Sequence, residues 1–76
     1  DKPMDFQTVF LGEVGLSAEI RSVSQIGLRI QEAEKLGFQK CLIPKNNLRA
    51  IKDINIKKIE IVAVETVREA LDFLKR

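Results

Sequence analysis

The sequence predicts a small α/β (α+β) fold in which one small sheet packs with two main helices. Almost continuous apolar segments at positions 40–43 and 59–64 are typical of buried strands. Two other segments carry apolar residues at the three- and four-residue spacing of a helix. Helices and strands alternate along the chain, which favours βαβ units, and a chain of 76 residues forms at most one domain.

The first part of the chain is expected to form strands. Residues 6–11 are rich in aromatic and β-branched types and run into Gly12, which predicts a strand that ends at a flexible point. From position 14 to 23 apolar and polar residues alternate, so a strand or a hairpin with one solvent-facing side is expected. The apolar members of this alternation are Val14, Leu16, Ala18 and Ile20.

A helix is predicted over residues 24–36. Ser24 is a suitable N-cap and Gly37 is well placed to end the helix. Gly27 in the first turn costs about 1 kcal/mol relative to alanine. It therefore marks either a close approach of another segment or a position where a larger residue is not needed. The face of the predicted helix is formed by Ile26, Ile30 and Ala33.

The segment Lys40–Ile43 reads as a buried strand that Pro44 ends, because proline has no backbone donor. A loop follows at Asn46-Asn47, with one short helical turn at most over residues 48–51. Residues 53–58 are expected to connect this loop to the next strand.

The last two elements are a strand over 59–64 and an amphipathic helix over 66–75, capped near Thr66 or Glu65. Two helices of this length are expected to cover only one side of the sheet, so the other side would need a partner. The apolar face of the final helix is predicted to contain Val67, Ala70, Leu71 and Leu74.

The composition excludes several classes of site. The chain has no histidine and one cysteine, so the ligand sets of zinc, copper and iron–sulfur sites are missing. Cys41 lies in an apolar run and is expected to be a core residue. No apolar run is long enough to cross a membrane and no signal peptide is visible, so we expect a cytoplasmic protein. The net charge of +2 is low for a dedicated nucleic-acid-binding module.

Three motifs in order carry a resemblance to a known family. They are Gly12-Glu13-Val14-Gly15-Leu16-Ser17-Ala18-Glu19-Ile20-Arg21, then Glu32-Ala33-Glu34-Lys35-Leu36-Gly37-Phe38, and then Leu42-Ile43-Pro44-Lys45-Asn46. Together they resemble the C-terminal, Lon-protease-like domain of the bacterial RadA (Sms) family over nearly the whole chain. The family pattern has glycine at the position of Ala18. The motif residues that we single out are Gly12, Glu13, Gly15, Glu19, Arg21, Pro44 and Lys45.

The resemblance implies the C-terminal part of a Lon-protease-like fold, shared with the second domain of ribosomal protein S5. Residues 1–76 would then be a partial domain, without its upstream half, the ATPase core or the zinc finger. Lon proteases use a serine–lysine dyad. The lysine position falls on Gly27 and the serine would lie upstream of this segment, so the resemblance implies no catalytic residue here.

What the resemblance implies is a scaffold that contacts DNA and supports assembly. The parent protein would be a DNA-dependent, RecA-like ATPase in recombinational repair and branch migration, forming a ring and binding ATP and zinc outside this segment. For the segment itself we expect no cofactor, no metal and no membrane contact, and a homo-oligomer that could be a dimer. The alternatives are a segment of a Lon-like ATP-dependent serine protease and a purely structural oligomerisation domain.

Basic residues are the candidates for contact with DNA phosphates, without readout of bases. Acidic residues are interleaved with them, so ordinary solvated charge is the competing explanation. Arg21, which lies in the motif, and Arg29, on the exposed side of the predicted helix, rank first. The full candidate set is Arg21, Arg29, Lys45, Arg49 and Lys52.

Overall fold

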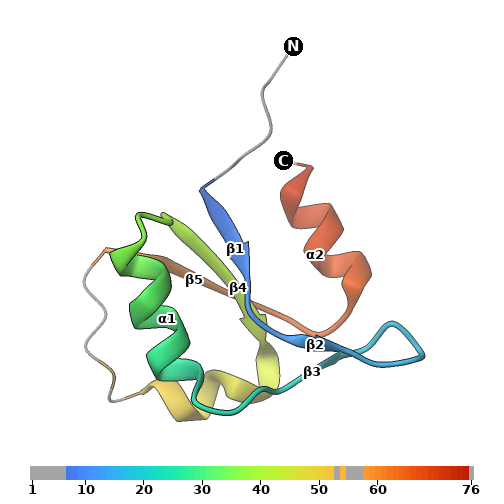
Figure 1. Cartoon of the computed structure of the whole chain (residues 1–76). Coiled ribbons are helices and arrows are strands. Elements are labelled where there is room, and N and C mark those ends of the chain that lie inside the picture. Colours follow the sequence, from blue (N-terminus) through green and yellow to red (C-terminus); the bar gives the residue numbers. More distant parts are fainter. Residues whose placement is uncertain (1–6, 53, 55–57, 76) are drawn as a thin grey trace.

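The computed structural model describes residues 7–52, 54 and 58–75. Within them the chain forms a three-stranded sheet, a two-stranded hairpin, two α-helices and one 3₁₀-helix (Figure 1). This mixture confirms the predicted α/β class. In chain order the elements are β1 (Thr8–Phe10), β2 (Glu13–Val14), β3 (Ile20–Arg21), α1 (Ile26–Lys35), β4 (Lys40–Pro44), η1 (Lys45–Ile51), β5 (Glu60–Val64) and α2 (Val67–Leu74).

The main sheet is parallel, with β4 between β1 and β5. β4 aligns Lys40 with Thr8 of β1 and with Glu60 of β5. Four of its five residues are buried, as expected for a parallel strand with cover on both faces. The strands predicted at 40–43 and 59–64 are therefore confirmed.

Pro44 lies inside β4, paired with Val64, and does not follow the strand as predicted. The backbone N–H of Lys40 donates to Gln7 on the side of β1. Because this direction repeats every second residue, the nitrogen of Pro44 also faces that side, where pairing with β1 has already ended at Phe10. The missing N–H therefore costs no hydrogen bond of the sheet.

Helix α1 covers one face of the sheet. Its predicted apolar face is confirmed, because Ile26, Ile30 and Ala33 are all buried. They form one core cluster with Cys41 and Ile43 of β4.

Helix α2 covers the opposite face. Ala70 packs in a second cluster with Leu42, and the partly buried Phe73 packs against it. The predicted apolar face of this helix is wrong in part, because Leu71 and Leu74 are 51% and 47% exposed. Phe73 takes their place, because Ala70 and Phe73, three residues apart, lie on the side of α2 that faces the sheet.

The two helices therefore lie on opposite faces of the sheet, as Figure 1 shows. Successive residues of a strand point to opposite sides, so Cys41 and Ile43 meet α1 while Leu42 meets the side of α2. The expectation that both helices cover one side and leave the other bare is wrong.

The ends of the helices have clear local causes. The N-cap of α1 is Gln25, in a left-handed conformation with φ of 54°, and not Ser24 as predicted. Its end matches the prediction: Gly37 has φ of 98°, and the N–H groups of Gly37 and Phe38 donate to Glu34 and Ala33. This is the Schellman pattern that glycine favours.

Helix α2 is capped by Thr66, one of the two predicted caps. The Thr66 hydroxyl accepts from the backbone N–H of Glu69 at 3.1 Å. The Glu69 carboxylate in turn accepts from the N–H of Thr66 at 3.2 Å. This reciprocal arrangement satisfies N–H groups that have no partner inside the helix.

The hairpin predicted as one option for residues 14–23 is present as β2 and β3, an antiparallel pair of two residues each. The expectation of one buried side is wrong: Ile20 is buried, but Val14 and Leu16 are exposed. The alternation spans a turn, where Ala18 has φ of 63°. Val14 and Ile20 are partners across the hairpin, so they lie on the same face. The body of the protein covers that face at Ile20 and leaves it open at Val14.

Candidate nucleic-acid interface

The family-like motif residues come together where the hairpin meets the ends of β4 and β5. The hairpin is attached to the body by backbone bonds: the N–H of Ile20 donates to Glu65 at 2.9 Å, and that of Val67 donates to Ala18 at 3.1 Å. Gly12 precedes β2, and a side chain there would lie 3.2 Å from the ring of Pro44. These contacts place the motif residues of the hairpin beside Pro44 and Lys45.

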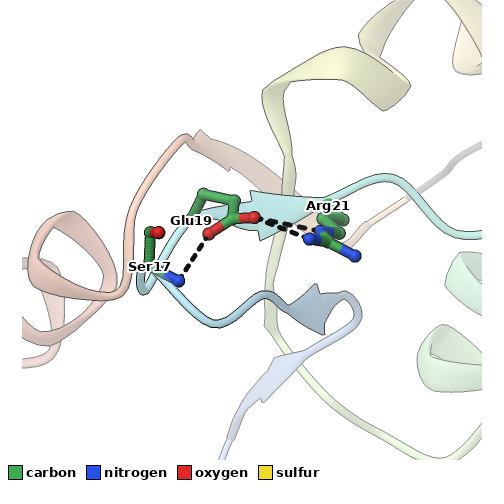
Figure 2. A network of polar contacts seen from close by, with 3 residues as sticks. All are labelled: Ser17, Glu19 and Arg21. Atoms are coloured by element: carbon green, nitrogen blue, oxygen red, sulfur yellow. Dashed lines mark hydrogen bonds and ion pairs between the residues drawn. The ribbon is translucent and has the colours of Figure 1, made fainter.

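Glu19 organises the tip of the hairpin (Figure 2). Its carboxylate accepts a hydrogen bond from the N–H of Ser17 at 3.0 Å. It also accepts one from Arg21 Nε at 3.1 Å and forms an ion pair with that guanidinium at 2.9 Å. A Cβ at Gly15 would overlap the carboxylate, so a side chain at this position would displace the Glu19 carboxylate from the place it occupies here.

The hydrogen bonds at Glu19 lower the pKa of its carboxyl below the ordinary value of 4.5. The largest cause is the hydrogen bond from its own backbone N–H, followed by the hydrogen bond from Arg21. Glu19 is therefore ionised at neutral pH and holds the Arg21 side chain along the hairpin.

Arg21 and Lys45, two of the predicted DNA-contacting residues, line one cavity of about 520 Å³. Three carboxylates, those of Glu13, Glu19 and Glu65, line the same cavity. Lys45 Nζ lies 3.9 Å from the Glu65 carboxylate. The two cations are thus outnumbered at this surface, which weakens their attraction for phosphate.

Arg29 lies elsewhere, on the outer side of α1. Its Nε donates to the backbone oxygen of Ser24 at 2.9 Å, and the residue is exposed. It lines a separate surface hollow with Glu32 and Lys35. Arg21 and Arg29, ranked together from the sequence, therefore line two different surface pockets.

Arg49 and Lys52 lie at the end of η1 and just after it, and both are exposed. Within the described residues, neither forms an ion pair. Of the five predicted residues, Arg29, Arg49 and Lys52 therefore present the least neutralised positive charge.

Sequence reasoning missed two polar side chains that hold these segments in place. Asn47 is buried, accepts from the N–H of Val23 and donates to its oxygen, both at 3.0 Å. Glu34 accepts from the N–H groups of Lys58 and Ile59 ahead of β5. The Asn46-Asn47 pair indicated a turn but carried no signal that the second amide points inward.

Cys41 is a core residue, as predicted, and is fully buried. Burial raises the pKa of its thiol from 9.0 to about 11. The thiol is therefore protonated at neutral pH and is a poor nucleophile.

The described part of the chain shows no group of three or more His, Cys, Asp and Glu side chains placed to hold a metal ion. None of its helices has the length and apolar character needed to cross a membrane.

Comparison with known proteins gives a consistent result. The chain is 48% identical over 71 residues to the DNA repair protein RadA of Streptococcus pneumoniae. It is 49% identical to that of Listeria monocytogenes and 45% identical to that of Bacillus subtilis, again over 71 residues. Each match covers 93% of this chain, but the chain spans only 15–16% of the length of these relatives. No protein-family model matches the sequence.

Proposed function

We propose, on the premise that this chain is homologous to a segment of the RadA DNA repair proteins, that it is a non-catalytic scaffold segment of such a protein. In this proposal it contacts the DNA backbone and supports homo-oligomeric assembly. The parent would be a RecA-like ATPase in recombinational repair and branch migration. The observation that carries the proposal is the 45–49% identity over 93% of the chain.

The proposed DNA contact rests on Arg29, Arg49 and Lys52. These side chains are exposed and form no ion pair with the described residues. Exposed guanidinium and ammonium groups that form no ion pair can bind phosphate oxygens and release counterions from DNA. Arg21 and Lys45 would contribute less because glutamates already pair with them.

The non-catalytic role is supported at Gly27, the residue on which the resemblance to Lon-like proteases would put the catalytic lysine. A Cβ at this position would overlap the side chain of Ile54. A lysine would therefore require Ile54 to move, and glycine itself has no side chain that could act as a base.

The test is binding of a fluorescent DNA duplex, followed by anisotropy across a salt series. The variant Arg29→Ala, Arg49→Ala, Lys52→Ala should bind more weakly and lower the salt slope by about 0.9 for each phosphate that is no longer neutralised. The matched control is Arg21→Ala, Lys45→Ala, which should change binding less. An equal loss of affinity in both variants would reject this choice of residues, and absence of binding at low salt would reject the DNA contact.

A purely structural assembly segment is the second candidate. It is favoured by the charge balance of the hairpin cavity, in which three carboxylates face two cations. Static light scattering distinguishes the candidates: a mass that rises with concentration, with no DNA binding at low salt, would support assembly alone. A monomer at all concentrations that binds DNA would support the DNA contact without self-assembly.

A further inference from the structure

Strand β5 is an edge of the main sheet. The N–H of Glu60 donates to Gln39 beside β4 at 2.9 Å. Backbone groups in a parallel pair alternate in direction, so Glu60, Val62 and Val64 bond to β4. The N–H and C=O groups of Ile61 and Ala63 therefore point away from the sheet.

This edge lacks the features that usually prevent strand addition. It contains no proline and its central residues Ile61, Val62 and Ala63 are uncharged. Natural edge strands are commonly protected by inward-pointing charges, proline, a bulge or a covering segment. An edge of five residues without these is a template for another strand.

A groove of about 460 Å³ runs between this edge and α2. Val62 and Phe73 contribute apolar surface, and the backbone of the edge is reached through Ala63. The carboxylates of Glu60, Glu69 and Asp72 line the same groove. The site therefore offers backbone hydrogen bonds together with negative charge.

We propose that β5 and this acidic groove bind an extended basic segment of a partner polypeptide, which adds to the sheet as a further strand next to Ile61 and Ala63. Side chains of a strand alternate between two sides, so those facing α2 would be lysine or arginine, opposite Glu60 and Asp72. Those on the other side would be apolar, next to Ile61. Main-chain bonds would give affinity and the alternation would give specificity.

A second copy of this chain is a poorer occupant than a basic segment. Two β5 strands paired about a twofold axis would bring together two acidic grooves, each lined by Glu60, Glu69 and Asp72. Like charges placed across strands are destabilising. The charge of the groove thus selects a basic partner.

The probe is a fluorescent synthetic peptide in which valine and lysine alternate over about eight residues, long enough to match the strand. Ala63→Pro removes an outward N–H without removing a bond to β4, and should weaken binding at least tenfold. Glu60→Lys, Asp72→Lys should weaken binding and reduce its salt dependence. The matched control for charge is Glu13→Lys, Glu32→Lys, away from the groove, which should retain most of the affinity.

Circular dichroism checks that each variant folds. If Ala63→Pro does not fold, the proposal is tested by the charge variants and by a second peptide in which valine and glutamate alternate. This acidic peptide should not bind. Binding of both peptides alike, or binding unchanged in the two groove variants, would overturn the proposal. Self-association that Ala63→Pro abolishes, without peptide binding, would replace the basic partner by a second copy.

Discussion

Strand β4 and the β2–β3 hairpin are held in place by different physical means. Four of the five residues of β4 are buried, between α1 on one face and α2 on the other. The hairpin instead exposes Val14 and Leu16 and is organised by the Glu19 carboxylate and by backbone bonds. The first region derives its stability from apolar burial, and the second has its shape fixed by local polar geometry.

Five of the seven singled-out motif residues, Gly12, Glu13, Gly15, Glu19 and Arg21, lie in or next to the hairpin. Gly15 makes room for Glu19, and Glu19 holds Arg21. Each of these residues maintains the shape of the hairpin. Residues that only fill the core of β4 can be exchanged for others of similar volume at small cost.

The largest effect is expected in β4. Ile43→Ala should lower the free energy of unfolding by about 2–5 kcal/mol, because the side chain is fully buried and a cavity would remain. Leu16→Ala at the exposed tip of the hairpin should change it by less than about 0.5 kcal/mol. Urea unfolding followed by circular dichroism measures both. Ile43→Val, with an expected decrease of about 0.5–1.5 kcal/mol, serves if the alanine variant does not fold. Similar decreases in the two regions would contradict the comparison.

The second effect concerns the link between η1 and the segment that joins the hairpin to α1. Asn47→Ala removes both hydrogen bonds to Val23. The backbone N–H and oxygen of Val23 then lose the partner that the Asn47 amide provides. We expect the free energy of unfolding to fall by about 1–3 kcal/mol. Asn46→Ala, at the exposed neighbouring position, is the matched control and should change little. Equal decreases would mean that the amide of Asn47 is not the link.

A gain in stability is expected within the hairpin. Ala18 has φ of 63°, a conformation that costs an L-residue about 1–2 kcal/mol. Ala18→Gly should therefore raise the free energy of unfolding by about 0.5–1 kcal/mol, after the greater chain entropy of glycine is subtracted. Ser17→Gly, next to it and without a positive φ, should lower the free energy of unfolding. A decrease in both variants would show that Ala18 is not strained.

The sequence predicted the elements well where the signal is local. The apolar runs in β4 and β5 and the helical spacing of Ile26, Ile30 and Ala33 require no knowledge of distant residues. The Thr66 cap and the Gly37 terminus are likewise determined within a few residues.

The tertiary arrangement could not be predicted in the same way. No local pattern decides which face of the sheet each helix covers. In α2 both the pair Leu71 and Leu74 and the single Phe73 continue the helical spacing from Ala70, so the spacing alone does not identify Phe73 as the core residue. The same applies to the candidate site. The ion pair between Lys45 and Glu65 joins residues far apart in sequence, and only the fold brings them together.

The smallest effect tests the polar organisation of the hairpin through pH. The folded chain lowers the pKa of Glu19 below 4.5, so its ionised form stabilises the fold. This contribution is complete above the ordinary pKa and disappears as the pH falls through the lowered value. The stability difference between the wild type and Glu19→Gln should therefore be present at about pH 7 and shrink by about pH 3.

An NMR titration of the Glu19 carboxyl separates the causes of its lowered pKa. In Arg21→Gln the pKa should rise only part of the way toward 4.5, because the backbone hydrogen bonds, which are the larger cause, remain. A full return to 4.5 would assign the effect to Arg21 alone. The guanidinium, and not the backbone of the hairpin, would then fix the position of the carboxylate.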